Sequence, residues 1–333
     1  MEQFDIPVAL ILFKRFEGPK RILEVIGKVQ PKKIYLLADQ GRNDQEKEMV
    51  RMCREEVEKS ITWPCEVIKY YAEENRGVFK NIGLGAKFVF EHEEKAIFLE
   101  DDNLPALSFF SYCKELLERY ENEDKILWIC GTNYLEKYEN ENQDSYMFTQ
   151  HLLPCGWASW KDKFLKYYDA YFETATKDSL KMLRKRYRKK ALYKQQLNCI
   201  NKEMNRYKEE HRFASWDYQI MYSLRHYNLY GISPKWNQIM NIGVDGLTTH
   251  GINGQPANQV MTSRFCNIPC HNLDFPLNHP KEINIDPIYD KKIEKIILYP
   301  LKTRIHMTIT GFIKRIVGPK LTKKIREKRL KSK

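Results

Sequence analysis

An uninterrupted apolar run of eight residues, Ile6–Phe13, lies near the start of the chain and constrains the fold more than any other feature. A strand that is buried on both faces reads as such a run, whereas a half-buried strand alternates apolar and polar residues. Shorter segments of similar character follow at Lys33–Ala38, Cys65–Tyr70 and Lys95–Leu99. We expect these four segments to be strands of one sheet.

Segments with helical spacing alternate with these strands. Pro19–Val29, Asp44–Lys59 and Gly77–Glu91 are the helices expected between them. Such alternation is typical of an open sheet, mostly parallel, that is flanked by helices. Farther along we expect helices at Ser108–Tyr120, Lys177–Arg212 and Trp216–Tyr227, a strand at Ile126–Cys130, and a loop-rich region from Gly243. The sequence therefore predicts an α/β fold with a mostly parallel central sheet.

Composition excludes several classes of protein. Hydrophobic residues make up 42% of the 333 residues, which is too many for a disordered chain. The longest apolar run falls far short of the roughly 18 residues that a membrane-spanning helix needs. The first residues lack the cationic leader and cleavage site of a signal peptide. We expect a cytoplasmic protein, so its eight cysteines should be reduced thiols, and Cys266-x3-Cys270-His271 has no second pair at zinc-site spacing.

Positive charge is concentrated in two segments. Lys177–Arg212 holds 13 Lys and Arg against 4 Asp and Glu, and Lys314–Lys333 holds 10 against 1. Together they carry +18, so the rest of the chain carries −6 of the total of +12. This distribution indicates contact with an anionic surface at defined places, and it disfavours a basic groove along a nucleic acid.

Three consecutive acids, Glu100, Asp101 and Asp102, end the fourth expected strand. In parallel sheets ligands bind beyond the carboxyl ends of the strands, which also directs attention to Lys14, Arg15 and Asp39. Adjacent carboxylates repel one another unless solvent or a cation is present. Mg²⁺ or Mn²⁺ typically takes one or two carboxylates together with substrate phosphates. The triplet therefore indicates a metal site, and a solvated acidic turn is the alternative interpretation.

Several segments resemble glycosyltransferases of the GT-A (Rossmann-like) fold, and specifically the N-acetylglucosaminyltransferase I group, which has a Glu-Asp-Asp motif, and its bacterial relatives. In chain order these segments are Leu12–Arg15, Ala38–Gly41, Asn75–Lys80, Lys95–Cys113, Leu153–Lys161, Ser215–Tyr218 and Asn241–His250. The resemblance covers roughly residues 5–255. The resemblance is specific because of the order and spacing of the segments, since any one segment alone would be weak evidence for this family.

The resemblance implies a role for each matching residue. Asp102 would contact Mn²⁺ or Mg²⁺, and Asp217 would be the catalytic base of an inverting transfer. Arg15 and Asp39 would contact the nucleotide, which would be UDP, and Lys80 would contact the donor. Glu100 would contact the donor sugar, and Asp101 the ribose or the metal's water. Gly156, Trp157 and Trp216 would contact the sugars, and His250 the diphosphate or the metal. From the sequence alone, Asp217 is equally well explained as an acid that begins a helix, and Trp157 as a core residue.

We expect a GT-A domain at 1–255 with a basic helical insert at 177–212, an extension at 256–309 that packs on this domain, and a basic amphipathic tail at 310–333. The tail would bind an anionic membrane surface at the inner face of the plasma membrane. The donor would be a nucleotide sugar, and the acceptor a glycan or a lipid-linked oligosaccharide of a bacterial surface polysaccharide.

Two other classes of protein are alternative interpretations of the sequence. A nucleotidyltransferase shares a similar nucleotide-binding fold, but it needs a glycine-rich cationic loop after the first strand, where Phe13–Pro19 offers only Gly18. A non-catalytic nucleic-acid-binding protein would use the two basic segments and show steep salt dependence. The mildly acidic remainder of the chain and the ordered acidic motifs disfavour it.

Overall fold

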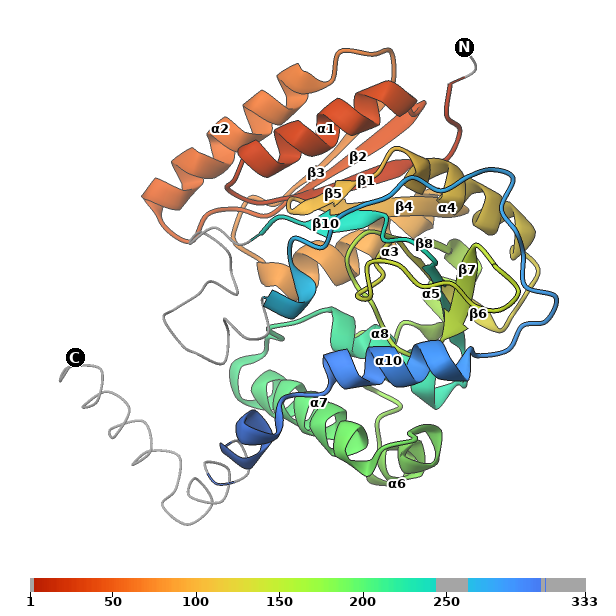
Figure 1. The fold of residues 1–333 in the computed structure, drawn as a ribbon. Coiled ribbons are helices and arrows are strands. Elements are labelled where there is room, and N and C mark those ends of the chain that lie inside the picture. Colours follow the sequence, from red (N-terminus) through yellow and green to blue (C-terminus); the bar gives the residue numbers. More distant parts are fainter. Residues whose placement is uncertain (1–2, 244–262, 307–308, 310–333) are drawn as a thin grey trace.

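The computed structural model describes residues 3–243, 263–306 and 309. Eight strands form the central sheet (Figure 1): β1 (Val8–Leu12), β2 (Lys33–Ala38), β3 (Glu66–Tyr71), β4 (Lys95–Glu100), β6 (Ile126–Cys130), β7 (Tyr146–Thr149), β8 (Trp157–Trp160) and β9 (Tyr230–Pro234). Two short strands, β5 (Asn103–Pro105) and β10 (Ile239–Asn241), pair in a small second sheet.

Helices connect and cover these strands. They are α1 (Glu17–Val29), α2 (Asp44–Ser60), the π-helix η1 (Phe79–Leu84), α3 (Gly85–His92), α4 (Ser108–Arg119), α5 (Lys161–Tyr167), α6 (Lys177–Met182), the 3₁₀-helix η2 (Leu183–Arg186), α7 (Lys190–Glu210), α8 (Asp217–His226) and α10 (Pro287–Ile297). The expected helices and strands of the first 130 residues are all present, with boundaries that differ by one or two residues at most ends.

The strand order of the sheet is β3-β2-β1-β4-β8-β6-β9-β7. β1, β2, β3 and β4 are parallel neighbours, and β6 is parallel to β9. β8 is antiparallel to both of its neighbours, and β7 is antiparallel to β9. The prediction of a mostly parallel sheet flanked by helices is confirmed. The sequence did not predict that Trp157–Trp160 forms a strand between β4 and β6.

Side chains of the buried strands alternate between two hydrophobic cores. Val8, Leu10 and Leu12 of β1 contact the core under α1, α2 and α4. Ala9 and Ile11 point to the opposite core, which η1, α3, α5 and α8 cover. Because successive side chains of a strand point to opposite faces, the apolar run at the start of the chain can supply both cores at once.

The basic insert is helical, as predicted, but it consists of three pieces, α6, η2 and α7. Leu180, Leu183, Leu192 and Ile200 bury their side chains in the core shared with α8. The insert therefore packs on the body through apolar side chains, while most of its cations are exposed.

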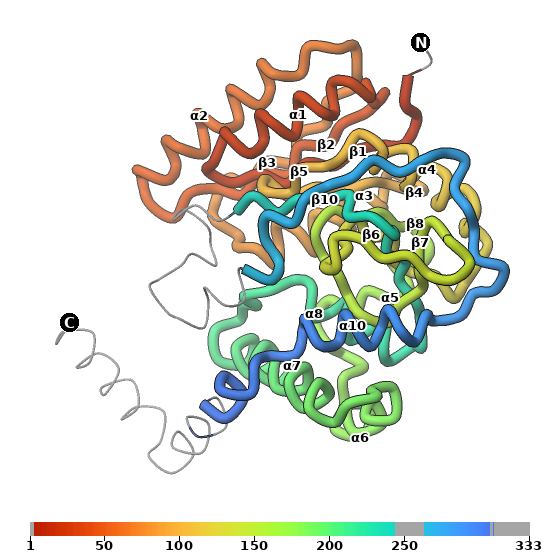
Figure 2. The backbone as a smooth tube through the Cα atoms, in the orientation of Figure 1, coloured from red at the N-terminus to blue at the C-terminus, as the bar shows by residue number. Residues whose placement is uncertain are grey.

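The prediction of a loop-rich region after Gly243 is wrong for α10. Asp286 caps this helix by accepting hydrogen bonds from the backbone of Ile288 and Tyr289. The chain reaches α10 by passing beside β10, α4 and β7 (Figure 2), with hydrogen bonds from Asn267 to β10 and from Leu277 to α4. All eight cysteines are free, as expected for reduced thiols. In the described part of the chain no helix is long and apolar enough to cross a membrane. The tail at 310–333 lies outside the described residues.

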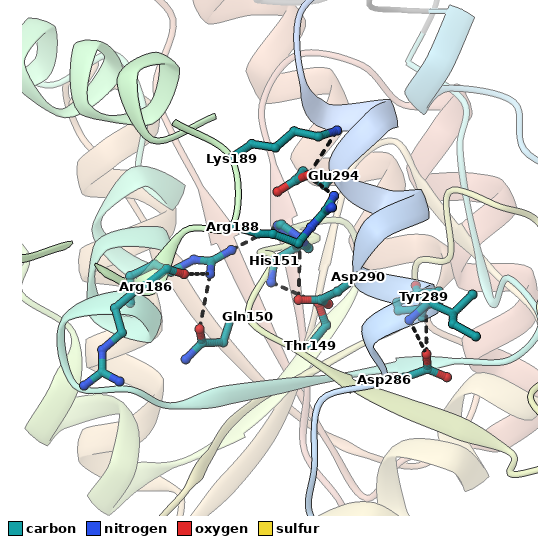
Figure 3. A network of polar contacts seen from close by, with 12 residues as sticks. Thr149, Gln150, His151, Arg186, Arg188, Lys189, Asp286, Tyr289, Asp290 and Glu294 are labelled. Carbon is teal, nitrogen blue, oxygen red and sulfur yellow. Dashed lines mark hydrogen bonds and ion pairs between the residues drawn. The ribbon is translucent and has the colours of Figure 1, made fainter. Parts of the chain in front are cut away.

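A polar network joins α10 to the body and to the insert (Figure 3). Thr149 donates a hydrogen bond of 2.5 Å to Asp290 of α10, and His151 lies 3.6 Å from the same carboxylate. Arg188 and Lys189, which follow η2, form ion pairs with Glu294. Residues 286–294 of the extension are thus held against both the sheet and the insert.

Candidate functional site

The site lies where the direction of strand order changes, between β1 and β4. From β1 the chain continues to β2 and β3 on one side, while β4 pairs with β1 on the other side. The crevice beyond the carboxyl ends of strands at such a point is where open α/β sheets bind ligands. A cavity of about 390 Å³ occupies this position, and it is lined by Lys14, Arg15, Phe16, Glu17, Gly18, Arg21, Asp101, Asp102 and Ile242.

Arg15 links the two strand ends that form the cavity. Its guanidinium donates hydrogen bonds of 2.7 and 3.3 Å to Asp101, and it lies 3.8 Å from the carboxylate of Asp102. All three side chains are mostly but not fully buried. The structure thus brings together three of the residues that the sequence analysis assigned to nucleotide and metal.

The carboxylate of Asp102 is held from several directions. Asn103 donates a hydrogen bond of 2.6 Å to it, and Asn241 donates another. Ile242 donates its backbone N–H to the Asp102 carbonyl at 2.8 Å, because β10 pairs with β5 directly after the acids. The pKa of Asp102 is raised to about 6, because burial and, to a smaller extent, the charge of Asp101 outweigh the lowering effect of Arg15 and of these hydrogen bonds. The site is therefore short of positive charge.

Glu100 points to the opposite side of the sheet from the cavity that Arg15 and Asp102 line. It follows Phe98 by two residues and so shares the face that Phe98 covers. Burial raises the pKa of Glu100 well above its ordinary value, and the charges of Asp102, Asp101 and Asp217 add to this increase. The structure therefore brings the predicted base, Asp217, close enough to Glu100 for their charges to interact.

Asp217 is the first residue of α8, where a negative charge is favoured by the helix dipole. The hydroxyl of Ser215 donates a hydrogen bond to it. The segment before it is anchored by α7, since the buried carboxylate of Glu203 accepts a hydrogen bond of 2.7 Å from the backbone of Ala214. The insert thus helps to position the start of α8.

Asp39 is buried and holds a neighbouring loop. Its two carboxylate oxygens accept hydrogen bonds of 2.8 to 3.0 Å from the backbone of Gln40, Arg76 and Gly77 and from the side chain of Asn75. Four hydrogen bonds use the acceptor capacity of a carboxylate. A contact between Asp39 and a uracil would therefore have to displace one of these bonds, and the predicted role of Asp39 does not fit this arrangement.

The predicted sugar-binding tryptophans lie in the core. Trp157 is 1% exposed, and its ring stacks on Phe98 at 4.0 Å and on Trp128 at 4.2 Å between ring centroids. Trp216 is also buried and lies 5.7 Å from Trp157. A sugar could not reach either face of Trp157 without displacing a side chain, so the structure corrects the prediction for this residue. Trp216 supports the turn that leads into Asp217.

The remaining residues that were predicted to contact ligands are Gly156, Lys80 and His250. Gly156 donates its backbone N–H to the Asn103 side chain at 2.7 Å and has a φ of +59°, a conformation that favours glycine. Its place is behind the acidic turn, so its role here is structural. Lys80 is exposed on η1, and its side chain forms no ion pair or hydrogen bond with another described residue. His250 lies outside the described residues.

The sequence analysis missed two glycines and two asparagines that shape the site. A Cβ atom at Gly18 would lie 2.1 Å from the Asp101 carbonyl, and one at Gly243 would lie 2.3 Å from the Asp102 carboxylate. Both glycines allow backbone to approach the acids closely. Asn103 and Asn241 hold the Asp102 side chain. Asn103 could have been found from its position directly after the triplet, whereas Asn241 and Gly243 reach it only through the β5–β10 pairing.

The donor set fits a hard divalent cation that is held mainly by substrate. Within residues 3–243, 263–306 and 309, no three His, Cys, Asp or Glu side chains converge to hold a metal ion by themselves. Carboxylate oxygen is nevertheless the ligand that Mg²⁺ and Mn²⁺ prefer, and one carboxylate with phosphate oxygens is a common arrangement for them. Asp102 offers such an oxygen at the edge of the cavity.

Neither a family model nor a curated protein matches the sequence. Among solved structures, HddC from Yersinia pseudotuberculosis is 13% identical over 47% of this chain and 77% of its own, with a TM-score of 0.31. The 4-diphosphocytidyl-2C-methyl-D-erythritol synthase from Anaerococcus prevotii is 10% identical over 53% and 77%, with a TM-score of 0.31. A UDP-glucose pyrophosphorylase complexed with UDP-glucose is 7% identical over 72% and 94%, with a TM-score of 0.35. These scores are too low to decide the chemistry of the site.

Proposed function

We propose that the protein is a metal-dependent glycosyltransferase of the inverting type. It would transfer a sugar from a nucleotide-diphosphate donor, with UDP as the nucleotide, to a glycan or a lipid-linked acceptor. The reaction would belong to the synthesis of a bacterial surface polysaccharide at the inner face of the plasma membrane. The motifs that resemble the N-acetylglucosaminyltransferase I group suggest this reaction.

One observation carries the proposal. Arg15, Asp101 and Asp102 meet in a cavity at the point where the strand order changes, and Asp217 lies near enough to interact with Glu100 on the other side of the same strand end. A transfer of this type needs a diphosphate site beside a sugar site that has a single positioned base. These two groups of residues would supply them.

The residues divide the work between binding and proton transfer. Arg15 and the backbone N–H groups of Glu17 and Gly18, at the start of α1, would bind phosphate oxygens. A Mn²⁺ or Mg²⁺ ion held by Asp102 and the donor phosphates would stabilise the departing diphosphate. Asp217 would take the proton from the acceptor hydroxyl as that oxygen attacks the anomeric carbon. No covalent intermediate is needed, because the leaving group and the nucleophile lie on opposite faces of the sugar.

Nucleotidyl transfer to a sugar phosphate is the alternative reaction. It requires a loop that wraps a triphosphate after the first strand, but here β1 ends at Leu12 and α1 begins at Glu17, with only Phe13–Phe16 between them. The geometry therefore favours transfer of the sugar over transfer of the nucleotide.

The decisive experiment is a screen of nucleotide sugars with Mn²⁺, with Mg²⁺ and with EDTA. We expect one UDP-sugar to raise the melting temperature only when metal is present, and to be hydrolysed slowly to UDP and free sugar. Asp102→Ala should lose both effects, while Asp162→Ala, which changes an exposed acid of α5, should keep them. Release of pyrophosphate from UTP and a sugar phosphate would instead establish nucleotidyl transfer. Unchanged metal-dependent binding in Asp102→Ala would remove the metal assignment.

A further inference from the structure

The last described helical segment exposes apolar side chains beside basic ones, Lys302 and His306. Residues 301–306 are helical, and Leu301 and Ile305 are 61% and 50% exposed. Thr303 and Arg304 are less exposed than these two apolar residues, and Arg304 donates a hydrogen bond to the Tyr299 carbonyl. A helix on the surface of a soluble domain normally turns its apolar side inward. This segment turns it outward.

The exposed apolar residues recur at helical spacing. Leu301 and Ile305 are four residues apart and so share one side of the helix. Ile309, four residues farther, is also in helical conformation and 53% exposed. Isolated exposed apolar residues are common on proteins, but a row of three at this spacing is a feature that needs a partner.

Exposed charge in the sequence that leads into this row is entirely positive. From Lys291 to His306 the sequence contains a single acid, Glu294, which is buried and paired with Arg188 and Lys189. Lys291, Lys292, Lys295 and Lys302 are exposed in the same stretch. The base of the helix is fixed to the basic insert, because Gln195 of α7 forms hydrogen bonds with Ile297 and Tyr299. Lys202 of α7 lies near this contact, since it interacts with Cys199, whose thiol contacts Tyr299.

We propose that Leu301, Ile305 and Ile309, with the lysines that flank them, form a docking surface for an anionic lipid bilayer. The apolar row would enter the acyl boundary, while the lysines would contact acidic headgroups. A nucleic acid would use the lysines but gain nothing from the apolar row. A second copy of this chain would bury the row against the same positive charge, which is unfavourable. A bilayer uses both features. Figure 1 shows this segment beside α7, at the end of the molecule opposite to α2.

This docking deepens the proposed function, which places the reaction at a membrane, but it can be measured without donor or acceptor, so its failure and the failure of the transfer reaction can be distinguished. The test uses the full-length protein and vesicles of phosphatidylcholine with or without phosphatidylserine. We expect binding to the mixed vesicles only, and weaker binding as salt is raised. Leu301→Ser with Ile305→Ser should weaken this binding roughly tenfold or more, because two large apolar side chains no longer enter the bilayer.

The matched control is Met52→Ser on α2, which removes another exposed apolar side chain, 53% exposed, from the opposite end of the molecule. It should bind vesicles as the wild type does. Equal far-UV circular dichroism would show that the variants are folded, and Lys302→Glu provides a second test if the double variant is not. Three results would overturn the proposal: equal binding by the double variant, a wild-type dimer that the double variant dissociates, or binding to polynucleotide in place of vesicles.

Discussion

The guanidinium of Arg15 donates hydrogen bonds to both carboxylate oxygens of Asp101, at 2.7 Å from Nη2 and 3.3 Å from Nε. Arg15 follows β1 and Asp101 follows β4, so this bidentate pair joins the two strand ends between which the cavity opens. Such a pair fixes orientation as well as charge, because the planar guanidinium matches the plane of the carboxylate. It holds the acidic turn in place before any ligand arrives.

Replacing Arg15 with Lys should therefore weaken donor binding although the charge is kept. Lysine supplies a single ammonium group, and it cannot maintain two parallel hydrogen bonds to Asp101. We expect the dissociation constant for a UDP-sugar with Mn²⁺ to rise about tenfold, the result of losing one charged hydrogen bond. Calorimetric titration would measure it. Arg21→Lys is the control, since Arg21 lines the same cavity but forms no ion pair with a described residue, and its variant should bind normally. Equal affinities in both variants would contradict the role of Arg15.

Replacing Gly243 with Ala should displace the carboxylate of Asp102. The new Cβ would lie 2.3 Å from Oδ2 of Asp102, much closer than atoms can approach, so one of the two groups must move. Because the metal contact depends on the position of this oxygen, we expect Mn²⁺-dependent donor binding to fall about tenfold or more, as in other displaced metal-site contacts.

Gly231→Ala is the matched control for this change. A Cβ at Gly231 would meet its nearest neighbour at 3.5 Å, an ordinary van der Waals distance. Its donor affinity should equal that of the wild type in the same titration. If Gly243→Ala also bound donor normally, Asp102 would not be the residue that holds the metal.

Three strands of the first half of the sheet could be predicted from sequence because they are buried on both faces. β1, β2 and β4 read as apolar runs, and their order relative to the helices is the local signal of a parallel sheet. β8 was missed because Trp157–Trp160 is only four residues long and resembles a ligand-binding segment. α10 was missed because its apolar residues, such as Tyr289 and Ile293, become buried only against distant parts of the chain.

For the site, the acids and Arg15 could be predicted because each lies at the end of a strand or within three residues after it. Contacts from residues distant in sequence could not be predicted, since they depend on pairings that leave no local pattern. Asn241 reaches Asp102 only because β10 pairs with β5. Asp39 showed the opposite problem: its position at a strand end suggested a ligand contact, but backbone N–H groups of a nearby loop occupy its oxygens.

Replacing Asp217 with Asn should slow turnover and leave donor binding unchanged. Asparagine has nearly the same shape and can still accept the hydrogen bond from Ser215, but it cannot take a proton from the acceptor. The loss of a general base lowers turnover by roughly 10²–10⁴. Ser215→Ala is the control, because it removes the hydrogen bond but keeps the carboxylate, and it should reduce turnover far less. Normal turnover in Asp217→Asn, with donor and acceptor saturating, would show that Asp217 only begins α8.

The network under α10 gives a prediction about stability and pH. Burial raises the pKa of Asp290 from 3.8 to about 6, although the hydrogen bond from Thr149 and the charge of Arg225 act in the opposite direction. Burial and Arg225 also lower the pKa of His151, the neighbour of Asp290 in this network (Figure 3). Arg225 is itself buried, with hydrogen bonds to Gln150 and to the Arg186 carbonyl.

Since the folded state binds the Asp290 proton more tightly than the unfolded state does, this carboxyl group stabilises the fold below about pH 4, and its contribution is lost as the pH rises through 6. An increase from 3.8 to about 6 corresponds to about 3 kcal/mol.

Asparagine at this position does not titrate. The free energy of unfolding of Asp290→Asn, relative to the wild type, should therefore increase by about 2 kcal/mol between pH 4 and pH 7.5, because part of the total change occurs below pH 4. The contribution of His151 is present in both proteins and largely cancels. Urea unfolding at several pH values measures the difference, with the exposed Asp274→Asn as a control that should follow the wild type at every pH. A relative stability of Asp290→Asn that stays constant over this range would show that Asp290 is ionised in the folded protein throughout.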